Sequence, residues 1–184
     1  IGVEIVPITY IVDGELFYES YSDENGDIEG LLKSKKEMTT SQPSPDLFQT
    51  VFEKQLALGN EVLCLTLSSR VSGTYSAAYM AATQMESGHV FVYDSLLSAG
   101  ALYLLVLEAV KLVEKGLSLA VIIEELDNLR QKASIFFTLD DMTRLRKSGR
   151  IGFVRMNVGT YLNIMPILQC KDGIIVADGV VRGK

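Results

Sequence analysis

Two clusters of hydroxyl side chains stand out as groups that could do chemistry. The first cluster precedes a Gln-Pro-Ser-Pro run and consists of Thr39, Thr40 and Ser41. The second surrounds Gly73 and consists of Ser68, Ser69, Ser72 and Thr74. Each cluster lies just before an expected helix, where backbone N–H groups and the helix dipole attract a carboxylate or a phosphate. Each hydroxyl could instead only cap a helix or complete a turn, and the residues alone leave both interpretations open.

The usual catalytic residue sets are absent from the sequence. The one histidine, His89, opens an apolar run and fits a surface position better than a catalytic one. There is no nucleophile elbow, phosphate-binding P-loop or dinucleotide fingerprint. Cys64 and Cys170 have neither metal-ligand nor disulfide spacing, and the pair Asp140-Asp141 is typical of a helix start. These residues predict a binding protein that is not an enzyme and has no metal or cofactor.

Composition narrows the class of protein further. The chain has 184 residues, 48% of them hydrophobic, and a net charge of −6. This composition excludes a disordered chain and disfavours a nucleic-acid binder, which would carry a basic surface. No apolar run approaches the about 20 residues that span a bilayer, and no secretory leader opens the sequence. We therefore expect a cytoplasmic protein with at most transient membrane contact.

The elements that must position the hydroxyl clusters alternate between strand and helix. Asp13-Gly14 predicts a hairpin within residues 3–19, and Ser44-Pro45 predicts a helix start. Apolar strands are expected at 61–67 and 89–93, followed by helices that reach about residue 85 and cover about 97–115 and 118–132. This order predicts an open, mostly parallel sheet with flanking helices. The serine-rich cluster would then lie at the carboxyl end of a strand, where such sheets bind ligands.

A different pattern begins at about residue 133. A strand at 134–140, a short basic helix, a second helix over 151–163 and two strands joined by Lys171-Asp172-Gly173 predict an α+β lobe. The expected fold class is therefore α/β with two lobes, an α/β lobe over 1–132 and the start of a smaller α+β lobe over 133–184. Both chain ends look like cuts through a larger protein.

Six short motifs follow one another in the order found in a known family. They are TSQPSPDLF (40–48), SSRVSGTYSAA (68–78), VYDS (92–95), LRKSGRIG (145–152), LNIMPIL (162–168) and VRG (181–183). In this series the chain resembles the DegV family of bacterial fatty-acid-binding proteins. It departs from the family at Met165, where Lys is usual, and at Ser148, where Gly is usual. Family members are longer, so the resemblance implies that a first strand and a C-terminal portion lie outside this chain.

The resemblance implies a carrier function. A long-chain fatty acid would be buried between two lobes and presented to the catalytic subunit of a fatty-acid kinase, which would convert it to an acyl phosphate. The carboxylate would be held by Thr40 and by Ser72 or Ser69. The full set of expected ligand-binding residues is Thr40, Ser41, Ser69, Ser72, Gly73 and Arg150.

Two other functions remain open. An enzyme acting on a small phosphorylated or carboxylated substrate could use the same anion-binding turns, with Asp94 or Asp13 as its base. A regulatory protein could instead dock a partner through the basic segment 144–155, which contains no acidic residue. That segment could also be an ordinary solvated helix face.

Overall fold

The structure is a computed structural model that describes residues 2–18, 30, 37–85, 88–139, 142–150 and 164–182. It contains two compact units that interleave along the chain. The first unit comprises Gly2–Cys64 and Ser76–Phe91, and the second comprises Leu65–Tyr75 and Val92–Lys184. The two lobes expected from the sequence, over 1–132 and 133–184, stay a prediction.

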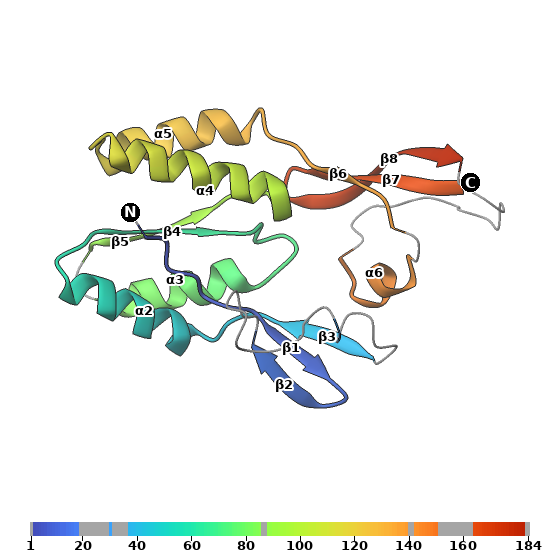
Figure 1. The fold of residues 1–184 in the computed structure, drawn as a ribbon, viewed down its shortest axis with the longest axis horizontal. Helices are drawn as coiled ribbons and strands as arrows, with labels where there is room; N and C mark the ends of the chain where they lie inside the picture. The colour runs from blue at the N-terminus through green and yellow to red at the C-terminus, as the bar shows by residue number, and fades with distance from the viewer. Residues whose placement is uncertain are drawn as a thin grey trace. The chain divides into compact units, whose positions relative to one another are not determined.

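An antiparallel sheet opens the first unit (Figure 1). Its strands are β1 (Thr9–Val12), β2 (Glu15–Tyr18) and β3 (Met38–Ser41), in the order β2-β1-β3. Asp13 and Gly14 form the β1–β2 turn with φ angles of 52° and 85°, so the expected hairpin is confirmed. The first strand is shorter than expected, because residues 3–8 precede β1 without belonging to a strand.

Helix α2 (Pro45–Ala57) begins where the sequence predicts. The Ser44 side chain caps it by accepting a hydrogen bond from the Leu47 N–H at 3.3 Å. Phe48 and Phe52 are buried on its inner face, with ring centroids 5.8 Å apart. A left-handed Gly59, with φ of 79°, follows the helix and ends it.

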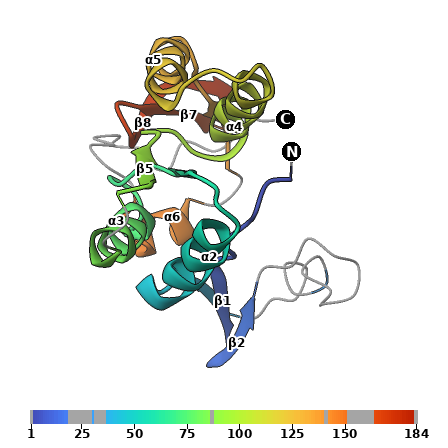
Figure 2. The ribbon, with the colours of Figure 1, turned by 90° about the vertical axis from the view of Figure 1, so that its left-hand side faces the viewer.

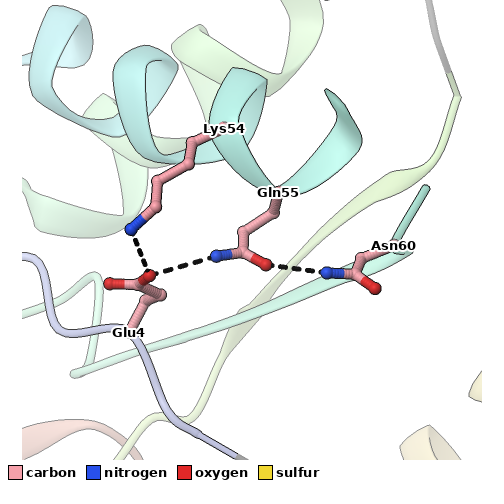
Figure 3. Close-up of polar contacts among 4 residues, drawn as sticks. All are labelled: Glu4, Lys54, Gln55 and Asn60. Carbon is pink, nitrogen blue, oxygen red and sulfur yellow. Dashed lines mark hydrogen bonds and ion pairs between the residues drawn. The ribbon is translucent and has the colours of Figure 1, made fainter. Parts of the chain in front are cut away.

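Polar contacts tie the N-terminal segment to the end of α2 (Figure 3). The Glu4 carboxylate is 2.6 Å from the Lys54 ammonium and accepts a 3.1 Å hydrogen bond from the Gln55 amide. Gln55 in turn accepts a 2.9 Å hydrogen bond from Asn60. All these groups are exposed, so each contact adds about 1 kcal/mol or less to stability.

Strands β4 (Val62–Thr66) and β5 (Val90–Asp94) form a parallel pair. The Val62 N–H donates to the His89 carbonyl at 2.9 Å, and the Ser95 N–H donates to the Thr66 carbonyl at 3.3 Å. Helix α3 (Thr74–Gln84) connects the two strands. The expected α/β class is thus confirmed, with a parallel sheet of two strands in the described part of the chain.

In the second unit, helices α4 (Ala99–Glu114) and α5 (Leu119–Arg130) lie side by side (Figures 1 and 2). Leu105 and Leu126 are fully buried on these helices. An antiparallel sheet follows in the order β6-β7-β8, and the short helix α6 (Thr143–Lys147) lies between β6 and β7 in sequence. The strands are β6 (Phe136–Phe137), β7 (Ile164–Lys171) and β8 (Ile174–Arg182).

Two sequence expectations for this second unit have definite outcomes. The strand expected over 134–140 is reduced to two residues in β6, whereas the β7–β8 hairpin is confirmed, with Asp172 and Gly173 at φ of 48° and 79°. The helix expected over 151–163 lies outside the described residues. Among the described helices, none has the length and apolarity needed to cross a membrane.

Candidate ligand-binding loops

The serine loop, defined as residues 68–73, follows β4 at its carboxyl end. Its first residue, Ser68, is fully buried. The Ser68 hydroxyl donates to the Gly173 carbonyl at 2.7 Å and accepts from the Arg70 N–H at 3.2 Å. The Ser68 N–H donates to the Leu97 carbonyl at 2.8 Å. Ser68 therefore anchors the loop to the β7–β8 turn, and its hydroxyl has no donor left for an anionic ligand.

Ser72 lies at the start of α3. Its hydroxyl accepts a hydrogen bond from the Thr74 N–H at 3.3 Å and is 2.8 Å from the Thr74 hydroxyl. This geometry satisfies the helix start, which is the simpler of the two roles the sequence left open. It also leaves a hydrogen-bond donor for a ligand. When the Thr74 hydroxyl donates to Ser72, the Ser72 O–H is available to donate to an anion. Gly73 separates the two residues.

Arg150 lies against the serine loop. Its Nε donates to the Val71 carbonyl at 3.2 Å, and its Nη1 donates to the Ser148 carbonyl at 2.8 Å. The guanidinium has five N–H donors, so these two bonds leave donors for an anion. The structure thus brings Arg150 into contact with Val71, the residue before Ser72, although the two are 79 positions apart in the sequence. Contact between Arg150 and a ligand stays a prediction.

Ser69 is exposed, and its N–H donates to Asp94 Oδ1 at 3.1 Å. The sequence pointed to Asp94 only as the base of an alternative enzyme. Sequence reasoning also missed Gly173, whose carbonyl binds the serine loop. The available signal for Gly173 was its Asp-Gly pair, which indicates a turn but not what the turn contacts.

Thr40 and Ser41 belong to the first unit, on strand β3 at the edge of its sheet. They pair with Tyr10 and Thr9 of β1, and both are exposed. The Ser41 hydroxyl donates to the Gln42 carbonyl at 3.3 Å. The serine loop and Arg150 belong to the second unit, so convergence of the two hydroxyl clusters on one ligand stays a prediction.

The two thiols are poor nucleophiles. Burial raises the pKa of Cys64 to about 12. Burial also raises the pKa of Cys170, although hydrogen bonds from Ser98 and from the Gly173 backbone act in the opposite direction. Because the thiolate is the reactive form of cysteine, neither side chain is activated near neutral pH. Within the described residues, no group of three or more His, Cys, Asp or Glu side chains could hold a metal ion.

These features define an α/β protein with a serine-rich loop after a parallel strand, a basic side chain against that loop, and a hydroxyl-bearing edge strand elsewhere. The model of the DegV family, described as a family of uncharacterised proteins, matches residues 1–184. The chain therefore belongs to the DegV family.

Relatives and solved structures agree with this membership. A DegV domain-containing protein of Halalkalibacterium halodurans is 35% identical over 184 residues, which cover 99% of this chain and 65% of that protein. The structure of a DegV family protein from Thermus thermophilus, described as fatty-acid binding, matches with a TM-score of 0.87 and 33% identity, covering 99% of this chain and 65% of that one. The Streptococcus pneumoniae fatty acid kinase B3 protein, loaded with linoleic acid, matches with a TM-score of 0.81 and 25% identity, covering 97% and 64%. The chain thus spans slightly less than two thirds of the length of these proteins.

Proposed function

We propose that the protein containing this chain binds a long-chain fatty acid and presents its carboxylate to the catalytic subunit of a fatty-acid kinase. The observation that carries this proposal is the match to the Thermus thermophilus structure, which extends over 99% of this chain and is described as fatty-acid binding. The kinase partner is supported by the match to the Streptococcus pneumoniae protein, whose description names a fatty acid kinase.

The residues proposed to surround the carboxylate are Thr40, Ser41, Ser69, Ser72, Gly73 and Arg150. Hydroxyl and amide donors hold a carboxylate without a covalent step, and each bond to the charged head contributes about 1.5–3 kcal/mol. These bonds mainly offset the cost of removing the carboxylate from water. Burial of a sixteen-carbon tail contributes more, on the order of 10 kcal/mol at about 0.8 kcal/mol for each methylene group. Affinity would therefore come from the tail and orientation from the head.

The presented head group must remain an ionised carboxylate. In the kinase reaction one carboxylate oxygen attacks the γ-phosphorus of ATP, the bond to the departing ADP oxygen breaks, and an acyl phosphate forms with no change in oxidation state. The partner kinase supplies the nucleotide and the catalysis. The residues of this chain hold and orient the acid, which makes the protein a carrier and not an enzyme.

Extraction of the purified full-length protein tests the proposal. Organic solvent should release a fatty acid of about 14 to 18 carbons in near-stoichiometric amount, identified by mass spectrometry. Protein stripped of lipid should take up added palmitate to the same level. A full-length protein that purifies empty and also takes up no palmitate would contradict the proposal.

A further inference from the structure

One carboxylate joins the loops that follow the two parallel strands. Asp94 is the last residue of β5, and its Oδ1 accepts a hydrogen bond from the Ser69 N–H at 3.1 Å. The same oxygen accepts the Leu96 N–H, also at 3.1 Å. The first bond reaches the serine loop across 25 residues of sequence, and the second holds the loop after β5. Asp94 therefore couples the serine loop to the neighbouring strand.

The position of Asp94 is itself fixed by helix α5. Arg130 donates from Nη1 to the Asp94 carbonyl at 3.2 Å and pairs through Nη2 with Asp127 Oδ1 at 2.9 Å. Asp127 Oδ1 also accepts the Tyr93 hydroxyl at 2.8 Å. The Arg130 guanidinium lies 5.5 Å from the centroid of the Tyr93 ring. These contacts hold the Tyr93 side chain and the Asp94 carbonyl against α5, so they fix the backbone that carries the Asp94 carboxylate.

The loop after β5 adopts a backbone conformation that needs such support. Leu96 has a φ of 51°, which is unfavourable for a residue with a side chain. Its N–H is one of the two that Asp94 binds. Loss of the carboxylate would release both N–H groups and relax the two loops together.

We propose that Asp94 is a positioning residue for the fatty-acid head group, because its carboxylate sets the orientation of Ser69 and with it the serine loop. This inference rests on the proposed function. Asp94 acts through the Ser69 backbone and does not bind the ligand, since one carboxylate in contact with another would repel it. The geometry of the accepting oxygen matters more for this role than its charge.

A competition between an acid and its alcohol separates head-group positioning from general stability. The full-length protein is offered equal amounts of palmitic acid and hexadecanol in phosphatidylcholine vesicles, and the bound lipids are quantified by mass spectrometry. The two lipids share a tail, so their ratio reports on the head group alone. We expect Asp94→Ala to lower the acid-to-alcohol ratio about tenfold, equivalent to the loss of one hydrogen bond to a charged group.

Two conservative variants distinguish geometry from charge. Asp94→Asn keeps an oxygen at the same place and should keep the ratio within about threefold of wild type. Asp94→Glu keeps the charge but moves the oxygens by one methylene group, and should lower the ratio nearly as far as alanine does. This pair also decides the question if Asp94→Ala fails to fold. Asp178→Ala, which removes an exposed carboxylate from β8, is the matched control and should leave the ratio unchanged.

Each outcome has one meaning. A wild-type protein that takes up no acid contradicts the proposed function itself. A wild type that binds acid, with Asp94→Ala or Asp94→Glu at the wild-type ratio, overturns the positioning role and leaves the proposed function intact. An Asp94→Asn ratio as low as that of Asp94→Glu also overturns it, because the negative charge would then be needed as well as the position of the oxygen.

Discussion

Tyr93 connects strand β5 to helix α5 through its hydroxyl group. The side chain is 5% exposed, and its hydroxyl donates to Asp127 Oδ1 at 2.8 Å. Burial, together with this hydrogen bond, raises the pKa of the Tyr93 phenol above its ordinary value, although the positive charge of Arg130 acts in the opposite direction. The folded protein therefore keeps this proton at a pH where an unfolded tyrosine, with a pKa near 10, loses it.

The consequence is a loss of stability in alkaline solution. Above about pH 10 the unfolded state binds fewer protons at Tyr93 than the folded state, so the free energy of unfolding falls as pH rises. Tyr93→Phe should be about 1 kcal/mol less stable than wild type at pH 8, because it lacks the hydrogen bond to Asp127. Its deficit should shrink between about pH 10 and 11, because phenylalanine does not titrate. Urea unfolding at a series of pH values measures both curves.

Tyr103→Phe is the matched control for this prediction. Tyr103 is 60% exposed on α4, so the loss of its hydroxyl should leave the free energy of unfolding at pH 8 within about 0.5 kcal/mol of wild type. Parallel curves for wild type and Tyr93→Phe up to pH 11 would show that the Tyr93 phenol titrates normally.

At the scale of elements, the β7–β8 turn packs closely on the serine loop. An added Cβ at Gly173 would lie 2.5 Å from the Ser68 hydroxyl oxygen and 3.0 Å from a Leu96 methyl carbon. The φ of 79° at Gly173 also disfavours any side chain. Two separate costs therefore oppose substitution at this position.

Gly173→Ala should lower the free energy of unfolding by about 2–4 kcal/mol, as the sum of backbone strain and a clash with a buried hydroxyl. Gly116→Ala provides the comparison, because Gly116 has a φ of 71° and no atom within 4 Å of its added Cβ. Only the backbone cost of about 1–2 kcal/mol applies there. Urea unfolding of both variants measures the difference, and equal losses would show that the turn does not contact Ser68.

Local sequence signals predicted an element correctly where its formation depends only on residues that are neighbours in the sequence. Both Asp-Gly pairs form turns, since Asp13 and Asp172 adopt the left-handed conformation that such pairs tolerate. Ser44 and Pro45 begin α2 because capping depends on neighbouring residues only. The alternation of residues 3–8 misled the prediction, because a strand also needs a partner strand: Val3 and Ile5 are exposed and lie outside β1.

For the candidate site, the sequence indicated residues but not the contacts that the structure shows for them. Hydroxyl density and a following helix identified the serine loop, and these are local features. The partners that fix the loop are distant in sequence: Gly173 is 105 residues from Ser68, and Arg150 is 79 residues from Val71. No periodicity connects positions so far apart, so only the fold could show that Ser68 is an anchor.

At the scale of the whole molecule, the proposed head-group site draws on both compact units. Thr40 comes from the first unit and Ser72 from the second, and the chain spans about 65% of the length of the relatives it matches. The site therefore exists only if the complete protein brings the two hydroxyl clusters to one carboxylate. Coupling between substitutions in the two clusters measures this directly, because residues that share a partner do not act independently.

A double-mutant cycle of Thr40→Val and Ser72→Ala in the full-length protein tests the convergence. Each single substitution should weaken palmitate binding by about tenfold to a hundredfold, because each removes one hydrogen bond to the carboxylate. The double variant should lose less or more than the product of the two, with a coupling energy of about 0.5–3 kcal/mol. Thr50→Val combined with Ser72→Ala is the control cycle, because the Thr50 hydroxyl donates to the Asp46 carbonyl at 2.9 Å on α2 and is not among the proposed head-group residues. If palmitate dissociation constants for the Thr40 and Ser72 cycle combine additively within about 0.5 kcal/mol, the two hydroxyls do not hold the same carboxylate.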